Sequence, residues 1–192
     1  MIGGRGKMAG FITYWPKEQI KNLKKEKDSG PIMVVFGSIH TKMPSIKSVK
    51  EGDVIYPVTV SGGTLCVAAR LPVEKIEPAY EYLIRELGNR CGALIPEGMD
   101  WREYYDTPMK PHKCHQRPFN CCSETAAVGA HGSSIELRPI SKEKLPQLLF
   151  GPTKAKQRPM LLDANGCPKV VSISSNVRKM SDETQELFDS LF

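Results

Sequence analysis

The sequence predicts an α+β protein in which a small bent β-barrel carries helices on its flank and continues into a loop-rich C-terminal lobe. Three observations lead to this fold class. Residues 46–76 have the pattern of a β-hairpin closed by a Gly-Gly turn, a proline lies inside the first strand, and helical apolar periodicity lies on both sides. Glycine adopts the positive φ angles of tight hairpin turns without steric cost. A bend at proline lets a short sheet curl toward a barrel.

The turn of this hairpin fixes which side chains share a face. With Ser61 opposite Thr64, one face pairs Val60 with Leu65, Val58 with Val67, Tyr56 with Ala69 and Val54 with Leu71, and the other pairs Thr59 with Cys66, Pro57 with Ala68 and Ile55 with Arg70. The first face is apolar apart from one tyrosine hydroxyl, as expected for a sheet packed on a core. Because Pro57 has no N–H to donate, we expect a bulge, a bend or an exposed edge there.

The chain before the hairpin predicts a strand, a surface helix and a second strand. Residues 11–15 form a short apolar entry, and residues 17–28 form a lysine-rich helix with only two inward apolar side chains. Residues 32–37 are β-rich and of strand length, which predicts a central strand. A polar loop, residues 38–44, leads toward the hairpin.

The chain after the hairpin predicts helices separated by loops. Residues 80–87 have helical apolar spacing and end at Gly88. Residues 123–128 predict a short helix. Other expected elements are a strand at 135–140, a short helical turn after Ser141, a hairpin joining 160–162 to 170–173, and a C-terminal helix that begins at Ser181.

Length and composition bound the organisation of the chain. Its 192 residues suffice for one core, or one core with an appended lobe, so we expect a disordered tail at 1–9, a barrel core at 10–90 and an extension at 91–192 packed on the same core. The net charge of +6 favours polyanionic partners, although a solvated basic surface gives the same charge. No secretory leader and no membrane-spanning apolar run are evident, which predicts a cytoplasmic protein with reduced thiols and no membrane partner.

The region around the hairpin resembles the PUA-like superfamily, which includes the PUA, ASCH and EVE domains. In those domains a Gly-Asp turn leads into a barrel strand, and the next strand ends in an Arg-x-x-Val exit. Gly52-Asp53 and the segment 70–73 correspond to these features, and the resemblance covers residues 10–90. Residues 37–42 keep the glycine and lysine of the ASCH loop at a different spacing. The resemblance implies binding of RNA, or of a modified base in DNA, without chemistry by the domain itself.

Candidate nucleic-acid contacts lie on the loop, on the hairpin and near the first helix. Ser38, His40 and Lys42 follow a buried strand, where they could contact phosphate or a base edge. Arg70 could stack on a nucleotide, or form a surface salt bridge. Trp15, with its neighbour Tyr14, could stack on a base, or belong to the core.

A cluster of cysteines and histidines supports the alternatives. His112, Cys114, His115 and Cys121 are ligand types that hold zinc, and zinc would brace a loop-rich lobe, although the spacing is irregular and buried thiols explain it equally. If the cluster is instead an enzyme active site, a cysteine activated by a histidine would be the nucleophile, with Glu124 orienting the histidine. The leading hypothesis is therefore a nucleic-acid-binding module that is not an enzyme. The alternatives are a metal- or Cys/His-dependent hydrolase or transferase centred on residues 112–131, and a protein-interaction module.

Overall fold

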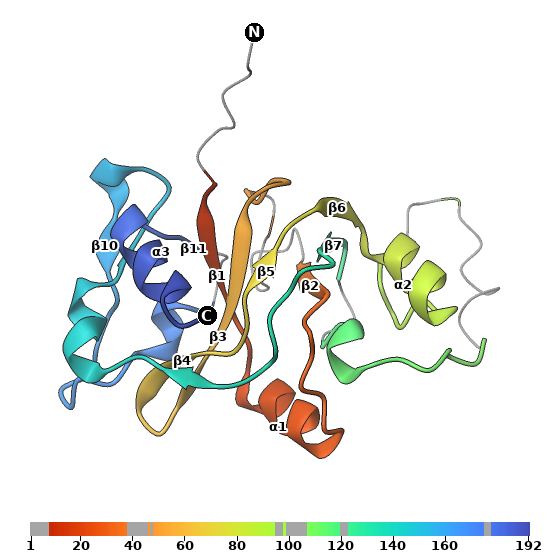
Figure 1. The fold of residues 1–192 in the computed structure, drawn as a ribbon, viewed down its shortest axis with the longest axis horizontal. Helices are drawn as coiled ribbons and strands as arrows, with labels where there is room; N and C mark the ends of the chain where they lie inside the picture. The colour runs from red at the N-terminus through yellow and green to blue at the C-terminus, as the bar shows by residue number, and fades with distance from the viewer. Residues whose placement is uncertain are drawn as a thin grey trace, which may run out of the picture.

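A computed structural model describes residues 8–37, 46, 48–94, 98, 107–119, 123–174 and 178–192, and within them the fold is α+β, as predicted (Figure 1). The strands are β1 (Gly10–Tyr14), β2 (Val34–Gly37), β3 (Val54–Ser61), β4 (Thr64–Val67), β5 (Leu71–Pro72), β6 (Lys75–Pro78), β7 (Thr125–Val128), β8 (Arg138–Pro139), β9 (Leu149–Phe150), β10 (Arg158–Pro159) and β11 (Arg178–Lys179). The α-helices are α1 (Lys17–Lys25), α2 (Ala79–Leu87) and α3 (Asp182–Asp189). Short 3-10 helices are η2 (Cys114–Gln116), η3 (Lys142–Gln147), η4 (Lys154–Lys156) and η5 (Val170–Ser172).

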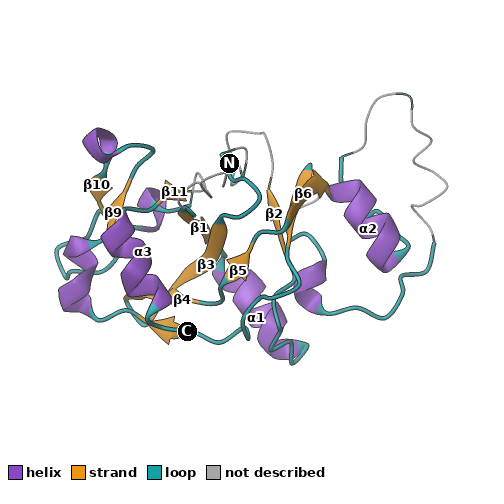
Figure 2. Ribbon diagram, turned by 45° about the horizontal axis from the view of Figure 1, so that its top comes forward, coloured by secondary structure: helices purple, strands orange, loops and turns teal. Residues whose placement is uncertain are grey.

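The largest sheet has the order β11-β1-β3-β4-β8, with β5 also paired to β3. β1 and β3 are parallel, so the chain must cross over between them, and α1 and β2 lie on that crossover. A three-stranded antiparallel sheet, β2-β7-β6, lies to one side, and β9 and β10 form a small pair (Figure 2). Within the described residues these sheets do not join into a closed barrel.

Three elements differ from the sequence predictions. Residues 170–172 form the 3-10 helix η5 instead of the second strand of a hairpin. Residues 125–128 form strand β7, between β2 and β6, instead of a helix. Ala126 and Ala127 are both fully buried there, and pairing on both edges outweighs the weak helical preference of so short a segment. β2 pairs only with β7 in the described part of the chain, so it lies at the end of its sheet and is not a central strand.

The predicted hairpin register is confirmed as far as Val67 and then shifts by one residue. Val58 faces Val67 as expected, but Ile55 faces Leu71 instead of Arg70. Three residues, 68–70, therefore lie opposite two residues of β3, which is a β-bulge next to Pro57, as expected from that proline. Segment 133–136 hydrogen-bonds to the bulge, through Ser133 N–H to the Arg70 carbonyl at 2.9 Å and Glu136 N–H to the Ala68 carbonyl at 2.9 Å.

The bulge changes which side chains share a face. Arg70 lies on the side of Tyr56, because both donate to the carboxylate of Asp189. Ala69 and Leu71, predicted to share the face of Tyr56, pack instead with Ile55. All eight side chains predicted to line the apolar face are buried, but these two line the opposite face.

β3 separates two hydrophobic cores. Tyr56 and Val58 pack against the C-terminal elements, including Phe150 and Phe188, in what we call the C-terminal core. Ile55 packs on the other side against α1 and β2 in the N-terminal core. Figure 1 shows the same division, with α3 and β10 on one side of β1 and β3, and β2, β6, β7 and α2 on the other.

The predicted helix ends are confirmed for α2 and α3. Gly88 ends α2 in the left-handed conformation at φ 71°, and the Ser181 side chain accepts a hydrogen bond from the N–H of Thr184 at the start of α3. None of the helices in the described ranges has the length and apolar character needed to cross a membrane.

Candidate functional site

A cavity of about 300 Å³ lies where β1 leads into α1 and where β2 ends. Aromatic side chains make up much of its wall, so we call it the aromatic pocket, and its defining residues are Tyr14, Trp15, Phe36, His115, Arg117 and Phe119. The local sequence explains its position: Pro16 stops β1 from continuing, and η2 packs across the gap that this leaves between α1 and β2. The volume is at the lower end of the range for small-molecule sites.

His115 is the buried polar side chain of this pocket. Its side chain is 0 % exposed, and its Nδ1 atom lies 2.8 Å from Oδ2 of Asp28, whose side chain is 2 % exposed. The same carboxylate oxygen accepts the backbone N–H of His115, also at 2.8 Å, and the other accepts the N–H of Gly30 at 3.0 Å. The carboxylate thus holds both the backbone and the ring of His115 in place.

The charge of Asp28 determines how the imidazole is protonated. Burial alone would raise the pKa of Asp28, but the hydrogen bonds from the His115 ring, from its backbone and from Gly30 lower that pKa to about 2. Asp28 is therefore ionised at neutral pH, and Nδ1 of His115 carries a proton that it donates to the carboxylate. In the neutral ring, the lone pair of Nε2 then remains as an acceptor.

Nε2 of His115 has no hydrogen-bond partner among the described residues, although it is fully buried. Buried polar atoms are nearly always paired, and an unpaired one costs about 1 to 3 kcal/mol. His115 lines the aromatic pocket, but its side chain is 0 % exposed, so a ligand N–H or O–H reaches Nε2 only if neighbouring side chains move aside. The pocket therefore combines an aromatic wall with a buried acceptor behind it.

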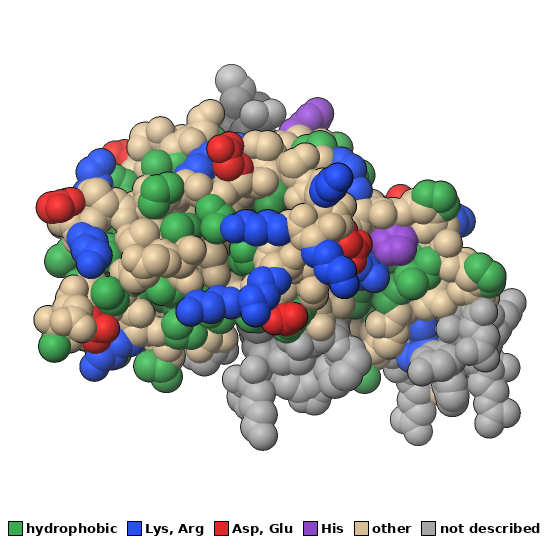
Figure 3. Space-filling view, turned by 90° about the horizontal axis from the view of Figure 1, so that it is seen from below, with side chains coloured by type: hydrophobic (Ala, Val, Ile, Leu, Met, Phe, Trp, Pro, Cys, Tyr) green, Lys and Arg blue, Asp and Glu red, His purple; other side chains and the backbone are tan. Residues whose placement is uncertain are grey.

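The rim of the pocket is more exposed than its floor. Phe119 is 41 % exposed, and Arg117 forms an ion pair with Glu26 that ties η2 to the end of α1. Pro16 and Gln19 also line the pocket. α1, which contributes Gln19 to the pocket, also carries exposed lysines. Figure 3, which views the molecule from the α1 end, shows Lys and Arg side chains gathered in the middle of that face.

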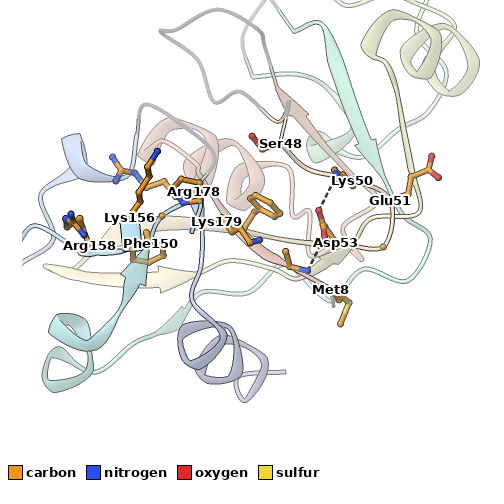
Figure 4. A pocket seen from close by; sticks show the side chains of 15 residues that line it. Met8, Ser48, Lys50, Glu51, Asp53, Phe150, Lys156, Arg158, Arg178 and Lys179 are labelled. Carbon is orange, nitrogen blue, oxygen red and sulfur yellow. Dashed lines mark hydrogen bonds between the residues drawn. The ribbon is translucent and has the colours of Figure 1, made fainter. Parts of the chain in front are cut away.

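A second, larger cavity of about 840 Å³ lies at the other end of β1 (Figure 4). Five cationic side chains line it, and we call it the basic hollow; they are Lys50, Lys156, Arg158, Arg178 and Lys179. Two acidic residues, Glu51 and Asp53, also line it. Positive charge therefore predominates in this cavity.

The residues predicted from sequence to contact nucleic acid have different environments in the structure. Arg70 is 28 % exposed at its side chain, and its Nε donates to Oδ1 of Asp189 at 2.8 Å, so this guanidinium already has an anionic partner within the chain. Trp15 is 5 % exposed and belongs to the N-terminal core, where one side of it lines the aromatic pocket. It is therefore not an open stacking surface. Ser38, His40 and Lys42 lie outside the described residues.

The predicted zinc ligands do not come together in the part of the chain that is described. His112 is half-buried and its Nδ1 lies 2.8 Å from the Lys110 carbonyl, whereas His115 is bonded to Asp28. No group of three metal-binding side chains occurs among the described residues, and Cys121 lies outside them, so a site that includes Cys121 stays a prediction.

Cys114 lacks the features of an activated nucleophile. Burial raises the pKa of its thiol, and this outweighs the opposite effect of the hydrogen bond with Arg117. A reactive cysteine needs the reverse shift, toward thiolate. Glu124, the proposed orienting group, has its backbone N–H bonded to the Gly37 carbonyl beside β2, at 3.0 Å.

Sequence reasoning singled out His115 but missed its partner. Asp28 lies 87 positions away, in the turn after α1, and no local pattern links the two. It also missed the basic hollow, whose cations come from separate segments of the chain. The only available signal was the excess of lysine and arginine, and a net charge does not indicate where in the fold the cations gather.

Comparison of the chain with protein-family models found no match, and comparison with curated proteins found none either. The function must therefore be argued from the two cavities themselves.

Proposed function

We propose that the protein is a nucleic-acid-binding module that holds one unpaired base in the aromatic pocket. The observation that carries this proposal is Nε2 of His115, which is buried beside a small cavity with aromatic walls and has no hydrogen-bond partner among the described residues. A nucleobase is planar, stacks on aromatic side chains, and presents N–H groups at its edge. It supplies the apolar ring and the donor that this pocket lacks.

Two further features support a nucleic acid over a free apolar ligand. The chain carries a net charge of +6, and Arg117 lines the pocket together with Gln19 of the lysine-rich helix α1. Cationic groups near a base pocket contact phosphates and position the strand. The resemblance of residues 10–90 to the PUA-like superfamily, which implies RNA or a modified base in DNA, points to the same class of ligand.

The test is binding of labelled single-stranded RNA and DNA of about twelve nucleotides, measured by fluorescence anisotropy. The substitution Phe119→Ala removes a stacking surface from the exposed rim. We expect it to lower the affinity for the oligonucleotide about tenfold, because one base–aromatic stack contributes about 1 to 3 kcal/mol. Leu161→Ala is the control, because Leu161 is an exposed apolar residue that lines neither cavity. Equal affinity of the two variants would reject the base pocket.

A second readout reports the histidine directly. In ¹⁵N-labelled protein, the Nε2 resonance of His115 should move upfield when the oligonucleotide binds, because a donated hydrogen bond engages the free lone pair. His115→Phe should abolish the base preference, and its thermal melting checks that the fold persists. An Nε2 resonance that does not respond to a bound oligonucleotide would contradict the proposed contact.

The Asp28–His115 pair also supports a second candidate function, a base-catalysed hydrolase or transferase. A carboxylate that fixes the tautomer of a histidine is the arrangement of a general base. If this is the function, incubation with nucleotides or oligonucleotides should give a new product by mass spectrometry, and His115→Phe should abolish it. Binding without any product favours the binding module.

A further inference from the structure

The basic hollow is assembled from elements at its two opposite sides. Lys156, Arg158, Arg178 and Lys179 come from the η4–β10 segment and β11 on one side, and Lys50 comes from the turn before β3 on the other (Figure 4). Figure 4 shows the four cations of the first side grouped together, with Glu51 at the opposite end. The acidic side chain therefore does not neutralise that group.

The cations of the hollow lack anionic partners within the described residues. None of the five takes part in a salt bridge there, and Nε of Arg178 is buried without any hydrogen-bond partner. Burial also lowers the pKa of Arg178, because it removes water from around the charge. Arg178 as a whole is half-buried, but leaving a charged group partly out of water without a counter-charge is costly, and a bound anion would offset that cost.

Asp53, the second acidic residue of the hollow, already accepts hydrogen bonds within the chain. Oδ1 of Asp53 accepts the N–H of Ala9 at 3.0 Å, and Oδ2 accepts the N–H of Lys50 at 2.9 Å. The carboxylate therefore joins the turn to the start of β1. It is part of the framework of the hollow and does not pair with any of its cationic side chains.

The hollow and the aromatic pocket are neighbours along the same strand. On β1, Phe11 lines the hollow and Thr13 lines the pocket. Likewise Ser174 lines the pocket and Arg178 lines the hollow, and four residues of extended chain span at most about 14 Å. A strand with one base in the pocket can therefore place its adjacent phosphates at the hollow.

We infer that the basic hollow binds the phosphate groups of the strand whose base enters the aromatic pocket. This inference rests on the proposed function, and it names the surface that positions the nucleic acid. Clustered Lys and Arg gain affinity by releasing phosphate counterions, and such contacts fix register without reading sequence. The pocket then supplies selectivity, and the hollow supplies most of the dependence on salt.

The experiment uses charge reversal in the full chain, with the same labelled oligonucleotide. Lys156→Glu combined with Arg158→Glu alters two exposed cations of the hollow, whereas Lys142→Glu combined with Lys144→Glu makes the same change in net charge at exposed lysines that line neither cavity. At roughly 50 mM salt we expect the first double variant to bind at least about tenfold more weakly than the unaltered protein, and this difference should shrink as the salt rises toward about 200 mM. Its slope of log affinity against log salt should fall by about 1.4, at about 0.7 for each lost contact with a single strand, and the control should change affinity less than about twofold.

The outcomes separate this inference from the function on which it rests. If Phe119→Ala weakens binding but both charge-reversal variants bind equally well, the hollow is not the phosphate site and the base pocket stands. If the hollow variant alone weakens binding and Phe119→Ala does not, the phosphate site stands and the base pocket is rejected. If the unaltered protein binds neither RNA nor DNA, both fail.

Discussion

A single carboxylate oxygen of Asp28 accepts two hydrogen bonds from His115, one from the backbone N–H and one from Nδ1, each 2.8 Å long. This contact joins the turn after α1 to η2. It also fixes the ring so that Nε2 is the free nitrogen. The position of the proton on His115 and the docking of η2 therefore depend on the same interaction.

Loss of the Asp28 charge should weaken the fold in acid. The pKa of this carboxyl falls from 3.8 to about 2 in the folded state, so the unfolded chain binds the proton more readily. The resulting stabilisation is fully present above about pH 4 and is lost as the pH falls toward 2. Its size is about 2 kcal/mol, from 1.36 kcal/mol for each pKa unit.

The measurement is urea unfolding of the protein and of Asp28→Asn at several pH values. Between pH 5 and pH 2 the unaltered protein should lose about 2 kcal/mol more than the variant, because Asn does not titrate. Parallel pH profiles for the two proteins would show that the carboxylate is not selectively stabilised by folding.

Arg70 should contribute to stability and not to nucleic-acid binding. Its Nε and the Tyr56 hydroxyl both donate to Oδ1 of Asp189, at 2.8 and 2.6 Å, which ties the bulge to the end of α3. Replacing Arg70→Met should lower the free energy of unfolding by about 1 kcal/mol, since the pair is partly exposed to water. Chemical denaturation measures this change, and Tyr56→Phe is the companion variant. If Arg70→Met instead lost much of its affinity for the oligonucleotide while its stability stayed unchanged, Arg70 would be a nucleic-acid contact.

Arg85 should be required to stabilise the buried carboxylate of Glu77. The Glu77 side chain is 1 % exposed and accepts hydrogen bonds from Arg85 at 2.7 and 2.8 Å, and from Lys75 at 2.6 Å. Removing Arg85 leaves a buried charge with one partner, so Arg85→Met should cost about 2 to 3 kcal/mol. The double variant Arg85→Met with Glu77→Met should recover part of that loss in thermal or urea melts. A double variant less stable than the single would show that the carboxylate is not the source of the cost.

Gly132 should tolerate no larger side chain. A Cβ at this position would lie 1.8 Å from the Ile32 carbonyl oxygen, and backbone cannot move aside as a side chain can. Gly132→Ala should therefore cost about 3 kcal/mol or more. Gly166→Ala is the matched control, because nothing lies within 4 Å of its Cβ position and only its φ of +71° adds strain of about 1 to 2 kcal/mol. Similar melting temperatures for both variants would contradict the close approach.

Local rules predicted the hairpin but not its continuation. The Gly-Gly turn fixed the register through Val67, because each pair there follows from the turn. Pro57 indicated a bulge but not which of the two strands carries the extra residue. The extra residue lies in segment 68–70, and it moves Arg70 to the face of Tyr56. The strand β7 was mistaken for a helix because its partners, β2 and β6, lie far from it in sequence.

The candidate site was predictable only in its individual parts. Trp15 and His115 were both singled out by residue type, one for stacking and one for metal. Their common pocket depends on the parallel pairing of β1 with β3 and on the contact of His115 with Asp28, which are long-range interactions. The cations of the basic hollow likewise come together only when β11 pairs with β1.

Because β3 is buried on both faces, the C-terminal core and the N-terminal core share this strand. Melting either core would leave apolar side chains of β3 in water, so these two cores must open together. The amide protons of residues 54–60, except Pro57, which has none, should then be the slowest to exchange with solvent deuterium, and their rates should report global opening.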